Sequence, residues 1–149
     1  MEFLVDKVFS LKSVPIFESL PESALLDVAR IMDFVEFKKD DVFIKKGEVA
    51  EDMFIIKQGK VAVVDGELIL ATLSENEIVG ELAILAPIKR TATVKALSDV
   101  ILYRIEREYF LDLLYEKPEM MSDLIEVLIN RIMFLNSELK KYQTLLQKR

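Results

Sequence analysis

The sequence contains no cysteine and no histidine among its 149 residues. Without thiols there are no disulfides, thiolate metal sites or iron–sulfur clusters, and without imidazole there is no histidine-ligated haem or zinc. The same absences exclude every nucleophilic mechanism that relies on cysteine or on a histidine base. We therefore expect a protein that is not an enzyme and that uses no metal and no cofactor.

The chain also lacks a long hydrophobic run, since no stretch of about 18 residues is both apolar and free of charge. Asp6 and Lys7 interrupt the apolar start of the chain, which argues against a secretory signal peptide. We therefore expect a cytoplasmic protein. An excess of positive charge is lacking too, because the formal net charge is −6, and this disfavours a nucleic-acid-binding surface.

What is present is the balance of a globular domain, with 52% hydrophobic and 31% charged residues. We predict a single domain, residues 1–149, of the α+β class. Residues 1–33 have helical periodicity, residues 34–106 form short β-rich runs separated by turn residues, and residues 107–149 are helical again. Such short runs are typical of a barrel or jelly roll, so we predict an eight-stranded β-roll. The strands are expected near residues 34–37, 42–45, 53–57, 60–64, 67–73, 77–79, 92–97 and 100–105.

Two turn signals lie within this β-rich part. Asp65 and Gly66 stand between two apolar runs and predict a two-residue hairpin loop. Asn76 stands at a second expected turn, and asparagine tolerates the left-handed backbone conformation that such a turn requires. We therefore expect the strands near residues 60–64 and 67–73 to pair as a hairpin.

The stretch from Gly80 to Val94 carries the residues that point most directly to a ligand. Gly80 lets a ligand approach the backbone, and a short apolar turn follows whose free amides attract anions. Glu81 supplies a carboxylate, and Arg90 supplies a guanidinium that fits a phosphate through two parallel hydrogen bonds. These groups together suit a sugar phosphate. The alternative is that Glu81 and Arg90 are two solvated surface residues.

This stretch resembles the phosphate-binding cassette of the cyclic nucleotide-binding domain family, and we call residues 80–94 the cassette. The resemblance rests on Gly80-Glu81-Leu82-Ala83, six further residues, and then Arg90-Thr91-Ala92-Thr93-Val94. It implies that Arg90 pairs with a cyclic phosphate and that Glu81 accepts a hydrogen bond from the ribose 2′-hydroxyl. The residues that the resemblance assigns to the ligand are Gly80, Glu81, Leu82, Ala83, Arg90, Thr91 and Ala92.

The resemblance also implies an apolar wall beside the ribose and the base. The residues at the corresponding positions are Val63, Leu70, Ala71 and Ile78. The alternative for each of them is a place in the ordinary core of the barrel.

The segment from Pro118 onward predicts a long helix with a heptad seam. Its apolar residues are spaced alternately by four and three positions, at Met121, Ile125, Leu128, Ile132, Leu135, Leu139, Tyr142 and Leu146. β-Branched residues at Ile125 and Ile132 with leucine at Leu128 and Leu135 favour a parallel two-stranded coil. We predict a homodimer through this helix. The alternative is a helix that folds back on its own barrel.

The same helix is expected to act as a lid. In the catabolite activators of the resembled family the long helix presents a polar pair to adenine, and the corresponding residues are Leu135 and Asn136, with Arg131 one turn earlier. Leucine replaces a hydroxyl residue there. The resemblance therefore leaves base contact either to Asn136 alone or to a residue from across the dimer.

Together these features predict a sensor of a cyclic nucleoside monophosphate, with cyclic AMP preferred over cyclic GMP. Ligand binding is expected to draw the cassette toward the barrel and to reposition the C-terminal helix. One alternative is a β-roll that serves only for dimerisation or docking, as a fragment of a longer transporter, channel or signalling protein. A second alternative, a cupin-type enzyme, would need clustered metal ligands, and the chain has no histidine. No feature of the sequence identifies the partner that the sensor would regulate.

Overall fold

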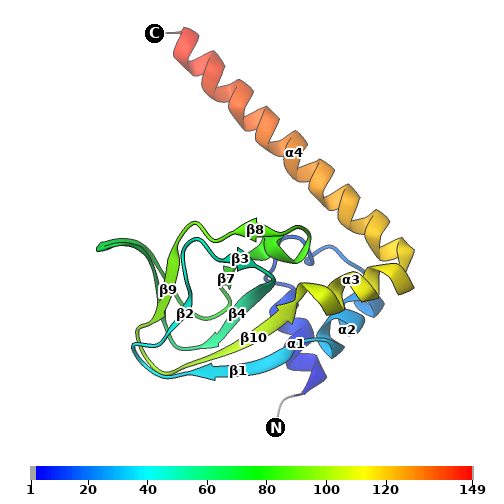
Figure 1. The fold of residues 1–149 in the computed structure, drawn as a ribbon. Helices are drawn as coiled ribbons and strands as arrows, with labels where there is room; N and C mark the ends of the chain where they lie inside the picture. The colour runs from blue at the N-terminus through cyan, green and yellow to red at the C-terminus, as the bar shows by residue number, and fades with distance from the viewer. Residues whose placement is uncertain (1–2, 149) are drawn as a thin grey trace.

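The chain folds into an antiparallel β-roll with short helices packed at one end and one long helix that leaves it (Figure 1). The computed structural model describes residues 3–148. The helices are α1 (Leu4–Leu11), α2 (Glu22–Arg30), the 3₁₀ turn η1 (Glu81–Ile84), α3 (Arg107–Glu116) and α4 (Pro118–Gln147). The strands are β1 (Asp33–Phe37), β2 (Val42–Ile44), β3 (Val49–Ala50), β4 (Asp52–Gln58), β5 (Val61–Asp65), β6 (Leu68–Leu73), β7 (Ile78–Val79), β8 (Ile88–Lys89), β9 (Thr93–Ala96) and β10 (Val100–Glu106). The predicted α+β class and β-roll are confirmed.

The described residues contain ten strands instead of the predicted eight. The two additional strands are β3 and β8, which pair with each other through Val49 opposite Lys89 and Ala50 opposite Ile88. Each is two residues long, which is too short to show the alternation on which strand prediction depends. This pairing fixes the middle of the stretch from Gly80 to Val94 against β3.

The other eight strands form two four-stranded antiparallel sheets. The first has the order β1-β10-β4-β7 and the second the order β2-β9-β5-β6. The long loop between β7 and β9 carries η1 and β8, so the cassette crosses from the edge of the first sheet to the interior of the second.

Strand β4 separates two hydrophobic cores because its side chains alternate between the faces of the sheet. Met53 and Ile55 pack against the helices in what we call the helix-side core, whereas Phe54 and Ile56 pack inside the β-roll in the roll core. All four side chains are buried. A movement of β4 would therefore disturb both cores, which ties the helices to the roll.

The hairpin between β5 and β6 forms as predicted, but its loop lies one residue later. Asp65 pairs with Leu68 at the end of the ladder, so the loop consists of Gly66 and Glu67 and not of Asp65 and Gly66. Gly66 has a φ of +60°, which glycine adopts without strain. Asn76 has a φ of +68°, which confirms the predicted left-handed turn.

A break between α3 and α4 sets the direction of the long helix. Lys117 has a φ of −130° and a ψ of 76°, because the residue before a proline avoids helical backbone angles, and Pro118 then occupies the first turn of α4. Met120 and Leu124 are buried in the helix-side core, and beyond them the helix leaves the body of the protein (Figure 1).

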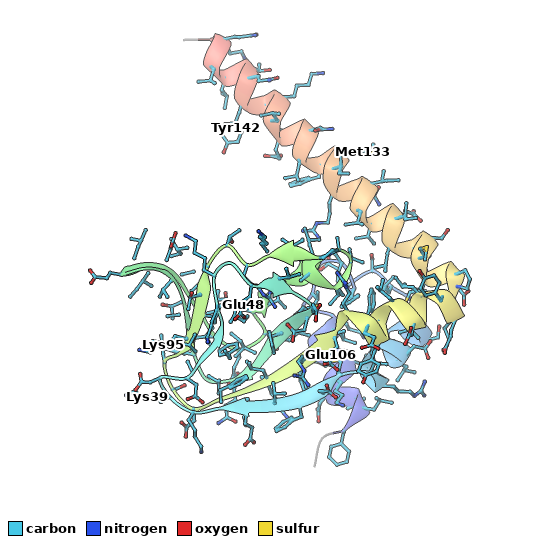
Figure 2. All side chains as sticks on the ribbon, in the orientation of Figure 1. Lys39, Glu48, Lys95, Glu106, Met133 and Tyr142 are labelled. Atoms are coloured by element: carbon cyan, nitrogen blue, oxygen red, sulfur yellow. The ribbon has the colours of Figure 1, made fainter. Side chains whose placement is uncertain are left out.

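The free part of α4 carries exposed apolar side chains. The side chains labelled Met133 and Tyr142 lie on the stretch that stands clear of the roll (Figure 2), and both are exposed. Although α4 has 30 residues, neither it nor any other helix within residues 3–148 combines the length and apolar character needed to cross a bilayer.

Candidate functional site

Gly80 is required at the start of the cassette by both its backbone conformation and its neighbours. Its φ is +76°, and a β-carbon built there would lie 2.3 Å from Nη1 of Arg90 and 3.2 Å from the carbonyl oxygen of Asp52. Only glycine therefore lets the guanidinium group lie against the backbone at this point. The turn η1 follows directly, and its buried residues Ala83 and Ile84 anchor it to the body of the protein.

A cavity of about 210 Å³ lies beside the cassette. Of the residues predicted to contact a ligand, those that line it are Val63, Gly80, Leu82, Ala83, Arg90, Thr91 and Ala92. Its other lining residues, not predicted from the sequence, are Ile44, Ala50, Val79, Ile88, Lys89 and Val94. The cavity is thus mostly apolar, with two cationic side chains in its lining.

A row of residues across the second sheet forms an apolar floor for this cavity. Val94 on β9 lies directly opposite Ile44 on β2 on one side and Val63 on β5 on the other. Directly opposed residues point to the same face of a sheet, so the three side chains meet at the cavity. Ala71 on β6 lies opposite Val63, continues the row and is exposed, outside the lining. Only the strand register reveals this row.

Arg90 is held at the cavity by Asp52 on β4. Its Nη2 atom donates to Oδ1 and to the carbonyl oxygen of Asp52, each at 2.8 Å, and 11% of its side chain is exposed. Burial lowers the pKa of Arg90, and the Asp52 carboxylate opposes that effect. Within residues 3–148 both side-chain hydrogen bonds of Arg90 come from Nη2, so its Nη1 and Nε atoms remain as donors for an anion.

The pKa of Asp52, the acceptor in this pair, is subject to opposing effects. Burial raises the pKa of its carboxyl group, and the positive charges of Arg90 and Arg104 oppose that rise, whereas the nearby Glu51 adds to it. The net direction is upward, because the loss of solvation outweighs the attraction of the two guanidinium groups. Protonation of Asp52 would weaken its ion pair with Arg90, and the raised pKa moves that protonation toward higher pH.

Glu81 is engaged by parts of the chain outside the roll. Its Oε1 atom accepts a hydrogen bond from Nη1 of Arg131 on α4 at 2.7 Å, and its Oε2 atom accepts one from the backbone N–H of Ile16 at 3.3 Å. Its side chain is 11% exposed. Its neighbours Gly80 and Leu82 line the cavity, but Glu81 does not. The carboxylate thus connects the cassette to α4 and to the segment between α1 and α2.

Like Ala71, the predicted wall residues Leu70 and Ile78 lie outside the cavity lining. Leu70 is exposed on β6. Ile78 on β7 packs against the helix-side core, whereas its neighbour Val79 lines the cavity. Successive side chains of a strand point to opposite faces, so a shift of one residue separates the predicted position from the lining one.

None of the predicted lid residues on α4 lines the cavity beside the cassette. Leu135 and Arg131 line a separate hollow of about 340 Å³ that α4 forms with residues 15–19. Asn136 is exposed and lines neither this hollow nor the cavity beside the cassette. Within residues 3–148, the hydrogen bond that the structure gives between α4 and the cassette is the one from Arg131 to Glu81.

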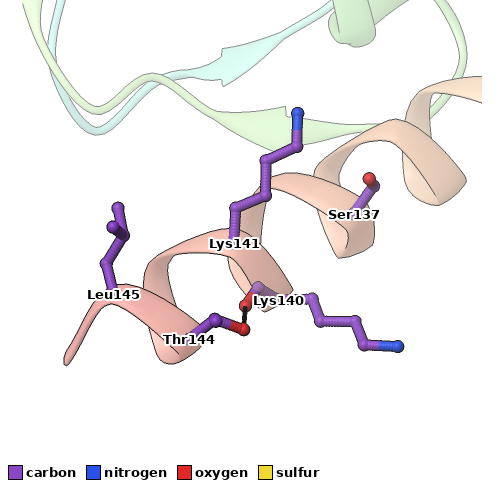
Figure 3. Close-up of a pocket in the computed structure, with 5 residues that line it drawn as sticks. All are labelled: Ser137, Lys140, Lys141, Thr144 and Leu145. Atoms are coloured by element: carbon purple, nitrogen blue, oxygen red, sulfur yellow. Dashed lines mark hydrogen bonds between the residues drawn. The ribbon is translucent and has the colours of Figure 1, made fainter. Parts of the chain in front are cut away.

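The last turns of α4 border another hollow, of about 530 Å³ (Figure 3). Its lining residues are Ser137, Lys140, Lys141, Thr144 and Leu145, and Oγ1 of Thr144 donates to the carbonyl oxygen of Lys140 at 3.0 Å. All of them belong to one helix, so the hollow lacks the opposing walls that enclose a small ligand. No group of three acidic side chains in residues 3–148 is placed to hold a metal ion. The cavity beside the cassette is the candidate binding site.

Comparison with known proteins places this site within a family of nucleotide-binding domains. The family model described as the cyclic nucleotide-binding domain matches residues 34–117. A cGMP-dependent protein kinase of Plasmodium berghei (strain Anka) is 34% identical over 101 residues, which are 68% of this chain and 12% of the kinase. The alpha subunit of the cone photoreceptor cyclic nucleotide-gated channel of Gallus gallus is 30% identical over 118 residues, 74% of this chain and 16% of the channel subunit. The chain therefore spans only a small part of these relatives.

Solved structures agree with the sequence comparison. The N-terminal domain of a transcriptional regulator from Streptomyces coelicolor A3(2) has a TM-score of 0.76 and 26% identity, over 87% of this chain and 94% of that domain. The regulatory domain of Toxoplasma gondii PKA, crystallised with cAMP, has a TM-score of 0.65 and 27% identity, over 73% of this chain and 43% of the other.

Proposed function

Because the chain belongs to the cyclic nucleotide-binding domain family, whose domain is regulatory and not catalytic, we propose that its cavity binds cyclic AMP, and cyclic GMP more weakly, as a signal that repositions α4. The observation that carries the proposal is the packing of Arg90 against Gly80 at the cavity. A buried guanidinium with two unused nitrogen donors suits a phosphate whose remaining surface is apolar ribose and base.

The remaining roles combine the resemblance to the family with the positions around the cavity. Arg90 binds the cyclic phosphate with the backbone near Ala83 and Thr91, and Glu81 accepts the ribose 2′-hydroxyl. Val63, with Ile44 and Val94, supports the ribose and base. Leu70, Ala71 and Ile78 lie outside the lining, so we assign them no contact in this conformation.

The preference for cyclic AMP is supported by the fold shared with the T. gondii regulatory domain that was crystallised with cAMP. Thr91 lines the cavity and carries a hydroxyl group, which by resemblance to the family can also reach the amino group of guanine. We therefore assign cyclic GMP as a weaker second ligand.

Calorimetric titration of the purified chain with cyclic AMP, cyclic GMP and linear 5′-AMP tests the proposal. We expect both cyclic nucleotides to bind, cyclic AMP more tightly, and 5′-AMP, with its additional phosphate charge, to bind far more weakly. Binding of neither cyclic nucleotide would contradict the proposed function. A cyclic GMP affinity tenfold above that of cyclic AMP would reverse only the base preference.

The exposed seam of α4 supports a second proposal, a homodimer through this helix. Ile132 and Leu139 are each 57% exposed, and Ile125 is 52% exposed, although the heptad pattern groups them on one face. This feature also favours the alternative of a dimerisation module that binds no ligand. Substitution of Ile132 by lysine is expected to give monomers in sedimentation equilibrium. A wild-type chain that is monomeric at high micromolar concentration would contradict the dimer.

A further inference from the structure

The carboxylate of Glu81 joins three segments that are far apart in the chain. Its two oxygen atoms bind Nη1 of Arg131, 50 residues later, and the backbone N–H of Ile16, 65 residues earlier. Only 11% of the Glu81 side chain is exposed, against 40% for Arg131. The ion pair is therefore shielded from solvent mainly on the side of the cassette.

This arrangement turns Glu81 away from the ligand. Gly80 and Leu82 line the cavity on either side of it, whereas Glu81 itself does not. Because Glu81 is outside the lining, we expect its side chain to turn toward a ligand hydroxyl in the cavity, and turning would break the 2.7 Å contact with Arg131.

Arg131 is also the last polar attachment of α4 to the body of the protein. Beyond it, the hydrogen bonds that the structure gives for α4 as far as Lys148 are internal to the helix, from Lys141 to Glu138 and from Thr144 to Lys140. The other end of α4 is fixed independently, because Lys117 pairs with Asp27 on α2 and Met120 is buried in the helix-side core. Loss of the Arg131 contact would therefore release the outer part of the helix while its base stays in place.

We propose that Arg131 and the ligand's 2′-hydroxyl compete for Glu81, so that the Arg131–Glu81 ion pair both lowers ligand affinity and fastens α4 to the cassette. The inference rests on the proposed function, since it names the regulation of the same cavity. By linkage, the ligand weakens the attachment of α4 by the same factor by which that attachment weakens the ligand. The position of α4 is thereby coupled to occupancy through one carboxylate.

The discriminating experiment titrates the Arg131→Gln variant with cyclic AMP and with 2′-deoxy cyclic AMP. The substitution should tighten cyclic AMP roughly tenfold, the effect of removing one charge-assisted competitor, and change 2′-deoxy cyclic AMP by less than about twofold. Lys140→Gln removes the same charge from an exposed position on α4 and should change neither affinity. Weaker or unchanged binding of cyclic AMP to Arg131→Gln, or equal tightening of both nucleotides, would overturn the competition.

The release of α4 has a separate readout. The chain has no cysteine, so Lys60→Cys on the roll and Lys140→Cys on α4 can carry two spin labels without further changes. We expect cyclic AMP to change the label distance in the wild-type background, and Arg131→Gln to change it without any nucleotide. An unchanged distance in Arg131→Gln would overturn the attachment.

The two proposals fail in distinguishable ways. If no cyclic nucleotide binds the wild type or any variant, the proposed function fails and the competition fails with it. If the wild type binds cyclic AMP but Arg131→Gln leaves affinity and label distance unchanged, only the ion-pair proposal fails.

Discussion

Two charged residues of the cassette, Glu81 and Arg90, are equally buried, yet they pair with different parts of the molecule. Arg90 and Glu81 are each 11% exposed. The partner of Arg90 is Asp52 on β4, inside the same roll, whereas the partner of Glu81 is Arg131 on α4. A guanidinium held by its own sheet stays in place when a helix moves, but a carboxylate held by the helix does not. Under the proposed function, Arg90 (the arginine end) would recognise the ligand, and Glu81 (the glutamate end) would transmit its binding to α4.

Removal of Arg90 should give the largest effect. Arg90→Leu leaves the phosphate without its guanidinium partner and should cost about 2–5 kcal/mol of binding free energy, roughly thirtyfold to a few thousandfold in cyclic AMP affinity. Calorimetry on the variant measures the loss, and Lys60→Leu, which removes a charge from an exposed position, is its control. An unchanged affinity in a folded Arg90→Leu protein would show that recognition does not lie at the arginine end.

The role of Glu81 is tested by removing the 2′-hydroxyl from the ligand. If Glu81 accepts the 2′-hydroxyl, loss of that hydroxyl removes one charge-assisted hydrogen bond, worth about 1.5–3 kcal/mol. In the wild type we expect 2′-deoxy cyclic AMP to bind roughly tenfold to a hundredfold more weakly than cyclic AMP. Competition titration measures the ratio, and equal affinities would remove Glu81 from the ligand site.

Gly80 precedes Glu81 in the chain and packs against Arg90, so a methyl group there should perturb the cassette. Gly80→Ala places a β-carbon 2.3 Å from Nη1 of Arg90, and we expect it to lower cyclic AMP affinity on the order of tenfold, about 1.4 kcal/mol. The left-handed backbone angle should cost ~1–2 kcal/mol of folding stability in addition.

Gly66→Ala is the matched control for this substitution. Gly66 also has a positive φ, but no atom lies within 4 Å of a β-carbon built there. It should lose comparable stability in thermal unfolding and keep its ligand affinity. Equal affinity losses in both variants would mean that the contact with Arg90 is not the cause.

The smallest expected effect is a pH dependence at the arginine end. Burial raises the pKa of Asp52, so just above the ordinary range of aspartate the folded chain binds more protons than the unfolded chain. The contribution of Asp52 to the free energy of unfolding is therefore fully present below the ordinary pKa of aspartate. It is lost as pH rises through the raised pKa of the folded chain. A phosphate beside Arg90 adds negative charge and should raise the pKa of Asp52 further, so binding takes up protons.

We therefore expect cyclic AMP affinity, measured by calorimetry, to increase as pH falls toward the raised pKa of Asp52. Asp52→Asn cannot titrate and should abolish the trend. Arg104 and Glu51 also act on this carboxyl group, so a trend that survives in Asp52→Asn would assign it to another group.

The sequence predicted the parts of the site that depend on local spacing. The cassette, residues 80–94, is a continuous string, and its Gly80 and Arg90 meet at the cavity. The eight strands other than β3 and β8 follow from short β-rich runs between turn residues, and the left-handed turn at Asn76 follows from the conformational freedom of asparagine. In each case neighbouring residues carry the information.

What required the structure depends on pairing between distant strands and helices. Val79, and not Ile78, lines the cavity. Both residues are apolar, so the sequence does not specify which of the two faces the cavity. The row of Ile44, Val94 and Val63 is set by strand register across three segments. The ion pair from Arg131 to Glu81 spans 50 residues, and heptad spacing places Arg131 on α4 without naming its partner.

The break at Lys117 lets α4 act as a lever, in which Arg131 lies closer to the pivot than the end of the helix does. A 30-residue helix is about 45 Å long at 1.5 Å per residue, and Arg131 lies roughly 20 Å from its start. If the helix pivots at Lys117, a displacement of 1–2 Å at Arg131, on the order needed to break one hydrogen bond, becomes roughly twice as large at Gln147. Mechanical gain of this kind requires a stiff rod and a fixed fulcrum. The uninterrupted helix supplies the first, and the pairing of Lys117 with Asp27 supplies the second.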